Sequence, residues 1–461
     1  MDGKDIVQDS REYAIEEAIP MSERNYGFLD MMFTWLGANA QPSVWWLGGV
    51  IAGMGIFSAF VVNILGTVIG ALTVALVGFI GFRMGTTTAG VIRVPLGING
   101  SKLLSILNAV TNIGFCGFAH YMGAITISYL LNMSLGTPVA GEPGSEPVMA
   151  IGILVIGTLS MIFVSVEGSK SIKIVERILS IGLIILSSWM TIVVVRSFDL
   201  TAIANWRPSA EQFVPFGVGF DMIFAGMLAW VLSSCEFTRY TKTRAAATGA
   251  PAIGLSIAGI WFIGVGILTV IAVASSTGVY DPNLSDPSTT AASLGLGWVA
   301  LLVILFTTIT SNLVCIYTAA FSVMNISRNV RFMPASLVSG ILTLIVGLIP
   351  VFVFSFYDSF MIFLDFISGS FPPLIAIVIC DYYLVRKGDY RMEYIAEKNG
   401  PYWYTNGVNW MTAVLWAAGV IFYIITKNVG VFSETTGAVI PTFVLTGVVY
   451  TLVAKKRWNH G

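Results

Sequence analysis

Three hydroxyl-bearing residues in one short stretch have the types and spacing of a cation site. Thr307, Thr310 and Ser311 stand at i, i+3 and i+4, so on a helix they share one face about one turn long. A hard cation needs several oxygen ligands at close range, and Na+ suits neutral oxygens because its charge is low. The same hydroxyls can instead bond back to carbonyls four residues earlier, as is frequent in membrane helices. The spacing favours a cation site only if a second element supplies more oxygens.

The apolar run 28–53 can be that second element, because polar and helix-breaking residues interrupt its middle. Gly37, Asn39, Gln41 and Pro42 stand there. Proline removes a backbone donor and clashes with the preceding turn. A break at membrane depth is tolerated only where it is packed in protein or lines a cavity. Freed carbonyls there can bind a cation, and half-helix N-termini can bind a polar ligand. A simple proline kink is the alternative interpretation.

A second interruption is predicted in the run 214–235. Gly217, Gly219 and Gly226 weaken this helix, and polar residues cluster at both of its ends. The runs 28–53 and 214–235 are the first members of two halves of five. Interrupted helices at matching positions in two halves indicate a central binding site in an inverted-repeat transporter.

The composition defines what kind of molecule must position these residues. Of the 461 residues, 56% are hydrophobic and 11% are charged, whereas a soluble domain carries about 25% charged residues. The mean hydropathy is +0.83. These values exclude a soluble enzyme, a secreted disulfide scaffold, a disordered protein and a nucleic-acid binder. The chain is predicted to be an all-α polytopic membrane protein.

Twelve apolar runs are long enough to cross the hydrocarbon core, which needs roughly 20 residues. They occupy residues 28–53, 55–82, 103–131, 147–166, 172–195, 214–235, 251–275, 295–324, 332–354, 358–385, 406–426 and 432–454. The first 27 residues are polar and mostly acidic, which does not match a signal peptide. They are predicted to form a cytoplasmic tail.

The distribution of positive charge supports this count. With the N-terminus inside, the inner segments hold 21 of the 24 Lys and Arg residues, and the outer loops hold only Arg196, Arg207 and Lys427. This asymmetry is what the positive-inside rule predicts for a chain with both termini in the cytoplasm. We therefore expect a multi-pass protein of the cytoplasmic membrane.

Four segments resemble one transporter family. They read TTTAGVIRVPLGINGSKLLSILNAVTNIGF at 86–115, EFTRYTKT at 236–243, TTITSN at 307–312 and FISGSFPPLIAIVICDYYLVRKGDY at 366–390. The last is the most specific, because the double proline Pro372-Pro373 is followed eight residues later by Asp381-Tyr382-Tyr383. From about residue 28 to 388 the chain resembles the nucleobase:cation symporter-1 family, which includes cytosine permease and purine, allantoin and hydantoin transporters.

The resemblance implies a leucine-transporter-like fold with helices 1 and 6 broken. Residues 1–27 would then be the cytoplasmic tail, 28–388 a ten-helix transport core of two inverted five-helix repeats, and 389–461 two additional helices with a short cytoplasmic tail. One substrate site is implied at mid-membrane, between spans 1 and 6 and spans 3 and 8. The family's cation site maps onto the carbonyls of Gly37, Ala40 and Thr307 and the hydroxyls of Thr310 and Ser311.

The family pattern places a base between an aromatic residue on span 3 and a second one on span 6. Span 3 here provides Phe115, with Asn112 in place of the family's amide residue. Stacking and a bidentate amide are what a neutral, planar, polar heterocycle needs. On span 6 the second face is either Met227 or Trp230, with backbone groups from Gly226.

Three further polar residues complete the predicted substrate site. Asn39 and Gln41 come from the interruption of span 1, and Asn312 either faces the substrate or packs within the protein. Ionisable groups at membrane depth are functional hypotheses in their own right. We therefore consider Asp365, Glu236 and His120 as candidates for coupling or gating. The alternative for Asp365 is a location near the outer mouth, and the alternative for Glu236 is a structural role. His120 can instead be a satisfied histidine of the core.

These observations predict a symporter that imports a nucleobase such as cytosine or a purine, or a related heterocycle, by alternating access. The driving ion is expected to be Na+, with H+ as the second choice. No enzyme activity and no cofactor besides the coupling ion are expected, since no catalytic constellation is visible. The expected partners are a small-molecule substrate, the cation and the lipid bilayer, without nucleic acid, and the chain is expected to be a monomer. The alternatives are an amino-acid or amine symporter of the same fold and a membrane receptor that does not transport.

Overall fold

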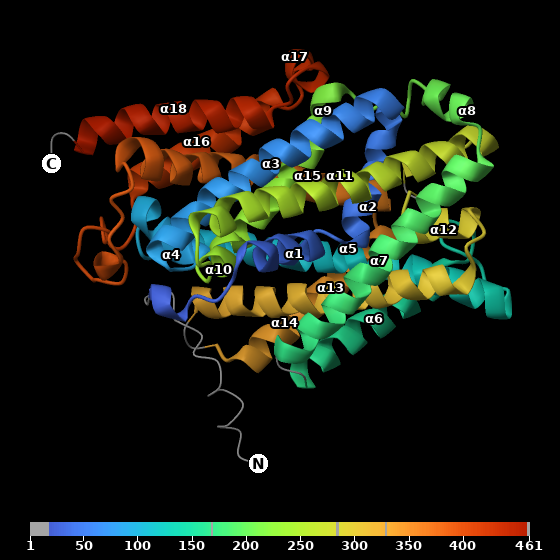
Figure 1. The fold of residues 1–461 in the computed structure, drawn as a ribbon, viewed down its shortest axis with the longest axis horizontal. Helices are drawn as coiled ribbons and strands as arrows, with labels where there is room; N and C mark the ends of the chain where they lie inside the picture. The colour runs from blue at the N-terminus through green and yellow to red at the C-terminus, as the bar shows by residue number, and fades with distance from the viewer. Residues whose placement is uncertain (1–17, 167–168, 283–284, 328–329, 459–461) are drawn as a thin grey trace.

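The computed structural model describes residues 18–166, 169–282, 285–327 and 330–458, and these fold into helices joined by loops (Figure 1). The first half holds α1 (Phe28–Ala38), α2 (Pro42–Ile51), α3 (Ile56–Met84), α4 (Thr88–Leu96), α5 (Lys102–Leu135), α6 (Glu146–Val166), α7 (Ser169–Ser197) and α8 (Leu200–Asn205). The second half holds α9 (Phe216–Leu228), the 3-10 segment η3 (Ala229–Ser233), α10 (Ser234–Thr238), α11 (Arg244–Thr277), α12 (Pro287–Ser293), α13 (Gly297–Ile326), α14 (Phe332–Phe352), α15 (Phe356–Cys380), α16 (Trp410–Thr426), α17 (Gly430–Glu434) and α18 (Val439–Trp458).

The two ends of the helix bundle carry different short elements. In Figure 1, α4, α10 and the C-terminal end of α18 lie at one end, and α8 and α12 lie at the other. The start of the described chain belongs to the first end, because the Ile19 amide donates to the Gly85 carbonyl just after α3 (3.0 Å). We call the α4 end the inner end and the α12 end the outer end.

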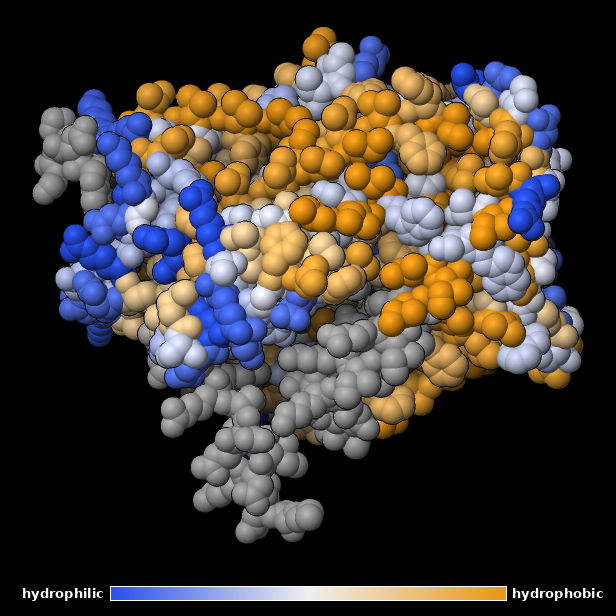
Figure 2. All heavy atoms as spheres, viewed as in Figure 1, coloured by the Kyte–Doolittle hydropathy of each residue, from blue (hydrophilic) through white to orange (hydrophobic). Residues whose placement is uncertain are grey.

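The surface has the pattern of a protein that is surrounded by lipid. Figure 2 shows a belt of hydrophobic residues between hydrophilic patches at the two ends. Leu337, Ile341 and Ile345, one turn apart on α14, are all about half exposed, a face that a soluble helix would not present to water.

Among the described residues, nine helices are long and apolar enough to cross a membrane, and three shorter apolar helices lie at Phe28–Ala38, Ile181–Ser197 and Trp410–Thr426. Each of the twelve predicted ranges contains helix. The chain is therefore an all-α, multi-pass membrane protein, as predicted, while twelve as the number of crossings stays a prediction.

The predicted interruption of the first span coincides with irregular backbone, whereas the glycines that predicted the second one, Gly217, Gly219 and Gly226, all lie within the regular helix α9. The first span is two helices, α1 and α2, with residues 39–41 between them. The sixth span leaves α-helical geometry at Ala229, continues as η3 and resumes as the single turn α10. A 3-10 segment within a helix is tighter and often marks a functional position.

The last long helix, α18, is attached to the rest of the bundle by two carboxylates. Asp221 of α9 accepts hydrogen bonds from the backbone N–H groups of residues 438 and 439 at the start of α18 (2.7 and 3.1 Å). Asp381, just after α15, accepts the Tyr450 hydroxyl of α18 (2.7 Å). A carboxylate at a helix N-terminus satisfies N–H groups that have no partner inside the helix.

Candidate functional site

The interruption of the first span turns several backbone groups away from the helical ladder. The Ala40 N–H donates to the Gly37 carbonyl (3.1 Å), and the Gln41 side-chain amide donates to the Ala38 carbonyl (2.7 Å). Pro42 occupies the first position of α2, where its missing N–H has no intrahelical partner to lose. Ala40 is buried, so this irregular backbone lies inside protein, where it is tolerated at membrane depth.

The side chain of Asn39 joins this interruption to the irregular part of the sixth span. Its Oδ1 accepts the indole N–H of Trp230 on η3 (3.0 Å). Its Nδ2 lies 3.9 Å from the Met227 sulfur on α9 and 3.4 Å from the Leu255 carbonyl on α11. Asn39 is fully buried. The structure thus brings together three of the residues predicted to bind substrate.

The two candidates for the second stacking face are both in contact with other groups. The Trp230 ring lies edge-on to Trp35 of α1, with ring centroids 6.1 Å apart. Met227 is buried and packs against Gly70 of α3. A side chain at position 70 would collide with it, because a Cβ there would lie 2.3 Å from the Met227 Cβ. Gly226 faces α2, since a Cβ on it would be 3.4 Å from Leu47.

The hydroxyl groups of α13 gather around one carbonyl. The hydroxyls of Thr310 and Ser311 each donate to the Thr307 carbonyl (3.0 Å in both cases). The Thr307 hydroxyl donates to the Val303 carbonyl (2.7 Å). These are back-bonds of the common kind, and they leave acceptor lone pairs on both hydroxyl oxygens. These two neutral hydroxyl oxygens are of the kind that suits a monovalent hard cation, so their chemistry fits the predicted ion.

Asn312 follows these hydroxyls directly and is a buried amide without a satisfied side chain. It is fully buried, and neither its Oδ1 nor its Nδ2 has a hydrogen-bond partner within the described ranges. Its carbonyl receives the Cys116 thiol of α5 (3.8 Å). Most buried side-chain polar atoms are hydrogen-bonded, so an exception calls for an explanation such as a ligand or water.

The span-3 candidates occupy a separate part of α5. The Asn112 side-chain amide donates to Oδ1 of Asn108 (2.8 Å), and Nδ2 of Asn108 donates to the Ser322 hydroxyl of α13 (3.0 Å). Phe115 meets the Phe363 ring of α15 edge-on at 4.9 Å. In the part of the chain that the structure describes, no hydrogen bond or ring contact links Asn112 or Phe115 to Asn39.

Aromatic residues of α15 close the outer side of this region, and the sequence analysis did not single them out. Trp46 of α2 is fully buried, with the rings of Phe356 and Phe360 at 4.9 and 4.6 Å. Phe356 also stacks on Tyr121 of α5 at 4.7 Å. The spacing of Phe356, Phe360 and Phe363, four and then three residues, places them on one face of a helix and was the available signal. The outer half of α15 thus bridges α2 and α5.

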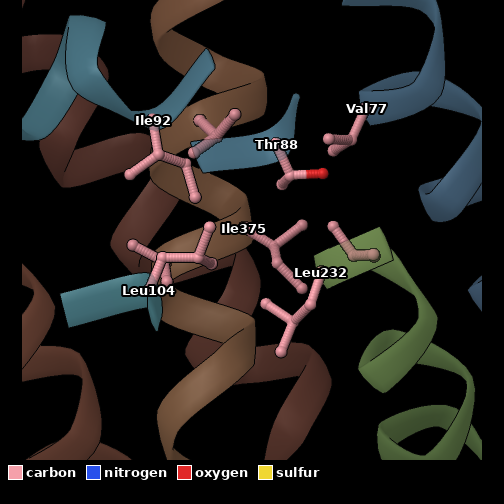
Figure 3. A pocket seen from close by; sticks show the side chains of 9 residues that line it. Val77, Thr88, Ile92, Leu104, Leu232 and Ile375 are labelled. Carbon is pink, nitrogen blue, oxygen red and sulfur yellow. The ribbon is translucent and has the colours of Figure 1, made fainter. Parts of the chain in front are cut away.

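A small apolar cavity lies on the inner side, between α3, α4, α5, η3 and α15 (Figure 3). It has room for about one water molecule. Its lining is apolar except for Thr88, and comprises Val77, Thr88, Ile92, Leu104, Val231, Leu232, Leu374, Ile375 and Val378. Glu236 accepts the Thr88 hydroxyl (2.6 Å) and its backbone N–H at the start of α4. The structure therefore places Glu236 beside the inner cavity, holding α4.

Asp365 and His120 lie away from Asn39. Asp365 forms an ion pair with Lys427 at the end of α16 (2.5 Å) and accepts the Tyr423 hydroxyl (2.9 Å). His120 packs near Gly157 of α6 and Gly347 of α14. Asp365 is thus directed toward α16, and His120 toward the α6 and α14 side of α5.

Comparisons with known proteins identify the family of the chain. The family described as permease for cytosine/purines, uracil, thiamine, allantoin matches residues 18–450. A putative purine-cytosine permease, YxlA of Bacillus subtilis (strain 168), is 26% identical over 427 residues, covering 88% of this chain and 86% of the relative.

Two solved structures share the fold. The inward-facing conformation of Mhp1 superimposes with a TM-score of 0.77 at 18% identity, covering 95% of this chain and 93% of that one. A closed conformation of Mhp1, a nucleobase-cation-symport-1 family transporter with bromovinylhydantoin bound, gives 0.74 at 18% identity, covering 96% of both chains. The expected family and fold class are confirmed. The chain belongs to the family of permeases for cytosine/purines, uracil, thiamine and allantoin, and it is a membrane transport protein rather than an enzyme.

Proposed function

We propose that this protein is a symporter that imports a nucleobase or a related planar heterocycle together with Na+. The observation that carries the proposal is the meeting of the two interrupted spans at the Asn39–Trp230 hydrogen bond. Irregular segments at matching positions of two repeats are where transporters of this kind bind substrate and ion. The names of the relatives, a purine-cytosine permease and a hydantoin-bound transporter, support this class of substrate.

The cation is proposed to bind between the first and eighth spans. Its ligands would be the carbonyls of Gly37, Ala40 and Thr307 and the hydroxyls of Thr310 and Ser311. All five groups are neutral, and the two hydroxyls lie beside the Thr307 carbonyl. An ion held there would favour the state that also binds substrate, and the difference in its affinity for the two states would set the coupling.

The heterocycle is proposed to bind between the third, sixth and eighth spans. Asn112 and Asn312 would offer amide groups, and Phe115 would offer a ring face. Asn39, Gln41, Gly226, Met227 and Trp230 would border the site from the interrupted spans. The outer half of α15 would close over the substrate, because Phe356 and Phe360 already bridge α2 and α5. The cavity beside Thr88 lies on the other side of this region from Phe356 and Phe360, on the path by which the substrate would leave toward the inner end.

The membrane orientation is part of the proposal. The inner end carries most of the positive charge, so we place it, with both termini, in the cytoplasm. Residues 28–388 would form the transport core of a monomer.

A ligand panel combined with transport assays tests the function. Purified protein is heated with purines, pyrimidines, hydantoins, allantoin or amino acids, each in NaCl or KCl, because selective binding raises the thermal midpoint. We expect stabilisation by one heterocycle, larger in NaCl, and Na+-gradient-driven accumulation of it in proteoliposomes. Stabilisation by amino acids alone would favour the amino-acid symporter, and binding without accumulation would favour a receptor.

A further inference from the structure

The hydrogen bond between Trp230 and Asn39 connects two segments that have different proposed tasks. Asn39 lies between Gly37 and Ala40, whose carbonyls are proposed cation ligands. Trp230 lies on η3, one turn after Gly226 and Met227, which border the proposed substrate site. The side chain of Asn39 spans the two segments, because its Oδ1 accepts the Trp230 indole N–H at 3.0 Å and its Nδ2 lies 3.9 Å from the Met227 sulfur.

Asn39 is well placed to control the carbonyls on either side of it. Its backbone N–H donates to the Trp35 carbonyl (3.2 Å), and its carbonyl accepts the Gln41 N–H (3.1 Å). The side chain is fully buried and held from two directions, by Trp230 and by the Leu255 carbonyl. Rotation of the Asn39 backbone would turn the adjoining peptide groups and would also break the contact with Trp230. The orientation of the cation-binding backbone is therefore tied to the position of η3.

The position of the Trp230 ring favours this connecting role over stacking on substrate. Its N–H is bonded to Asn39, and its ring lies edge-on to Trp35, which also meets Phe237 of α10 edge-on at 5.3 Å. Freeing the ring would break this hydrogen bond and leave the oxygen of the fully buried Asn39 side chain without the Trp230 N–H, which is costly for a buried polar group.

We propose that Trp230 is a positioning residue that transmits cation binding at the interruption of the first span to the substrate side of the sixth span. This inference rests on the proposed function. Binding of Na+ orders the backbone at 37–40, Asn39 holds Trp230, and η3 is fixed in the conformation that binds the heterocycle. Loss of the indole N–H uncouples the binding of Na+ from the binding of the heterocycle. It removes no group that is proposed to coordinate the ion or to hydrogen-bond the heterocycle.

The test is a linkage measurement in three proteins. The Kd of the heterocycle found in the ligand panel is measured in NaCl and in KCl for the wild type, Trp230→Phe and Trp35→Phe. Trp35→Phe is the matched control, because it removes the same ring volume while the Trp35 indole N–H has no hydrogen-bond partner among the described residues. The ratio of the two Kd values is the coupling factor, and a purely structural role would not change it selectively.

We expect Na+ to lower the Kd at least fivefold in the wild type and in Trp35→Phe, and less than twofold in Trp230→Phe. If Trp230→Phe does not fold, replacing Trp230 by benzothienylalanine, which keeps the bicyclic ring but lacks the N–H, gives the same comparison. An unchanged ratio in the Trp230 variant, or a ratio lost equally in the Trp35 variant, overturns the inference alone. A wild-type ratio of one overturns the proposed sodium coupling and this inference with it.

Discussion

At the scale of single residues, the candidate site contains two kinds of polar group. The hydroxyls of Thr310 and Ser311 are satisfied by a carbonyl on their own helix, whereas the Asn312 amide is satisfied by nothing in the described part of the chain. The two hydroxyls can hold an ion with their remaining lone pairs. When the ion is absent they stay hydrogen-bonded, so they cost little stability. The second kind lowers stability until a ligand or water reaches it.

Removal of both hydroxyls should eliminate sodium dependence. We expect the variant with Thr310→Ala and Ser311→Ala to bind the heterocycle with the same Kd in NaCl and KCl, because two of the five proposed oxygen ligands are lost. Thr308→Ala is the control: its hydroxyl also bonds back, to the Ile304 carbonyl, but Thr308 packs near Gly123 of α5. Sodium dependence that survives the double substitution would place the ion elsewhere.

Replacement of Asn312 by leucine should have opposite effects on folding and on binding. Without ligand, Asn312→Leu should raise the thermal midpoint, since a buried unpaired amide costs roughly 1–3 kcal/mol. The Kd of the heterocycle should rise about tenfold or more. Asn63→Leu is the control, because this equally buried amide of α3 donates to the Ile260 carbonyl (3.0 Å), and its loss should lower the midpoint. A lower midpoint for Asn312→Leu would show that the amide is already satisfied.

At the scale of helices, α15 contacts different partners along its length. Its outer half carries Phe356 and Phe360, and Pro372 and Pro373 interrupt its hydrogen-bond ladder further along. The indole N–H of Trp416 on α16 donates to the Ser370 carbonyl beside these prolines (2.9 Å). The helix is thus held at its weak point and can bend there.

Weakening the ion pair between Asp365 and Lys427 should favour opening of the outer half of α15. The pair is partly exposed, and such pairs contribute about 0.3–1 kcal/mol, so we expect Asp365→Asn to increase labelling of a cysteine at Ser359 by an impermeant reagent two- to fivefold. Ser359 is buried on the same half of α15. Asp358→Asn, which removes a carboxylate that bonds only its neighbour Ser355 in the described structure, should leave labelling unchanged. Equal labelling in both variants would contradict this role.

At the scale of the whole molecule, the outer end contains a buried carboxylate that should make stability depend on pH. Asp286 caps α12 through the backbone N–H groups of Ser288 and Thr289 (2.8 and 3.2 Å), and the Ser288 hydroxyl meets Thr126 of α5 (2.6 Å). Burial raises the pKa of Asp286 to about 6. A carboxyl with a higher pKa in the folded protein binds protons more readily when folded. Its contribution to stability is therefore largest below about pH 4 and is lost as pH rises through 6.

The substitution Asp286→Asn isolates this effect, because asparagine keeps an oxygen for the cap and has no charge. We expect a thermal midpoint equal to that of the wild type near pH 3.5 and higher at pH 7.5, with a stability difference of up to about 3 kcal/mol. Asp199→Asn, at the exposed N-terminus of α8, should show no such dependence on pH. A midpoint difference that does not change with pH would exclude Asp286 as the source.

Sequence patterns predicted those features that depend on neighbouring residues. Proline in the middle of an apolar run predicted the interruption at 39–41, and the spacing of Thr307, Thr310 and Ser311 predicted a shared face. Sequence patterns could not predict contacts between residues that lie far apart in the chain. Asp365 finds Lys427 62 residues later, and Glu236 caps a helix that begins 148 residues earlier. The choice between Met227 and Trp230 depended on the partner of each side chain, which only the packing of three helices determines.

The attachment of α16 and α18 limits how far this protein can be shortened. A version that ended at residue 388 would remove Lys427, the ion-pair partner of Asp365, and the N-terminus of α18, which Asp221 caps. Asp381 would lose the Tyr450 hydroxyl but would keep its ion pair with Arg386 (3.1 Å). Bare carboxylates in lipid are expensive. The chain up to residue 388 is therefore not a self-sufficient scaffold, and any shorter transporter built from it would need neutral residues in place of Asp221 and Asp365.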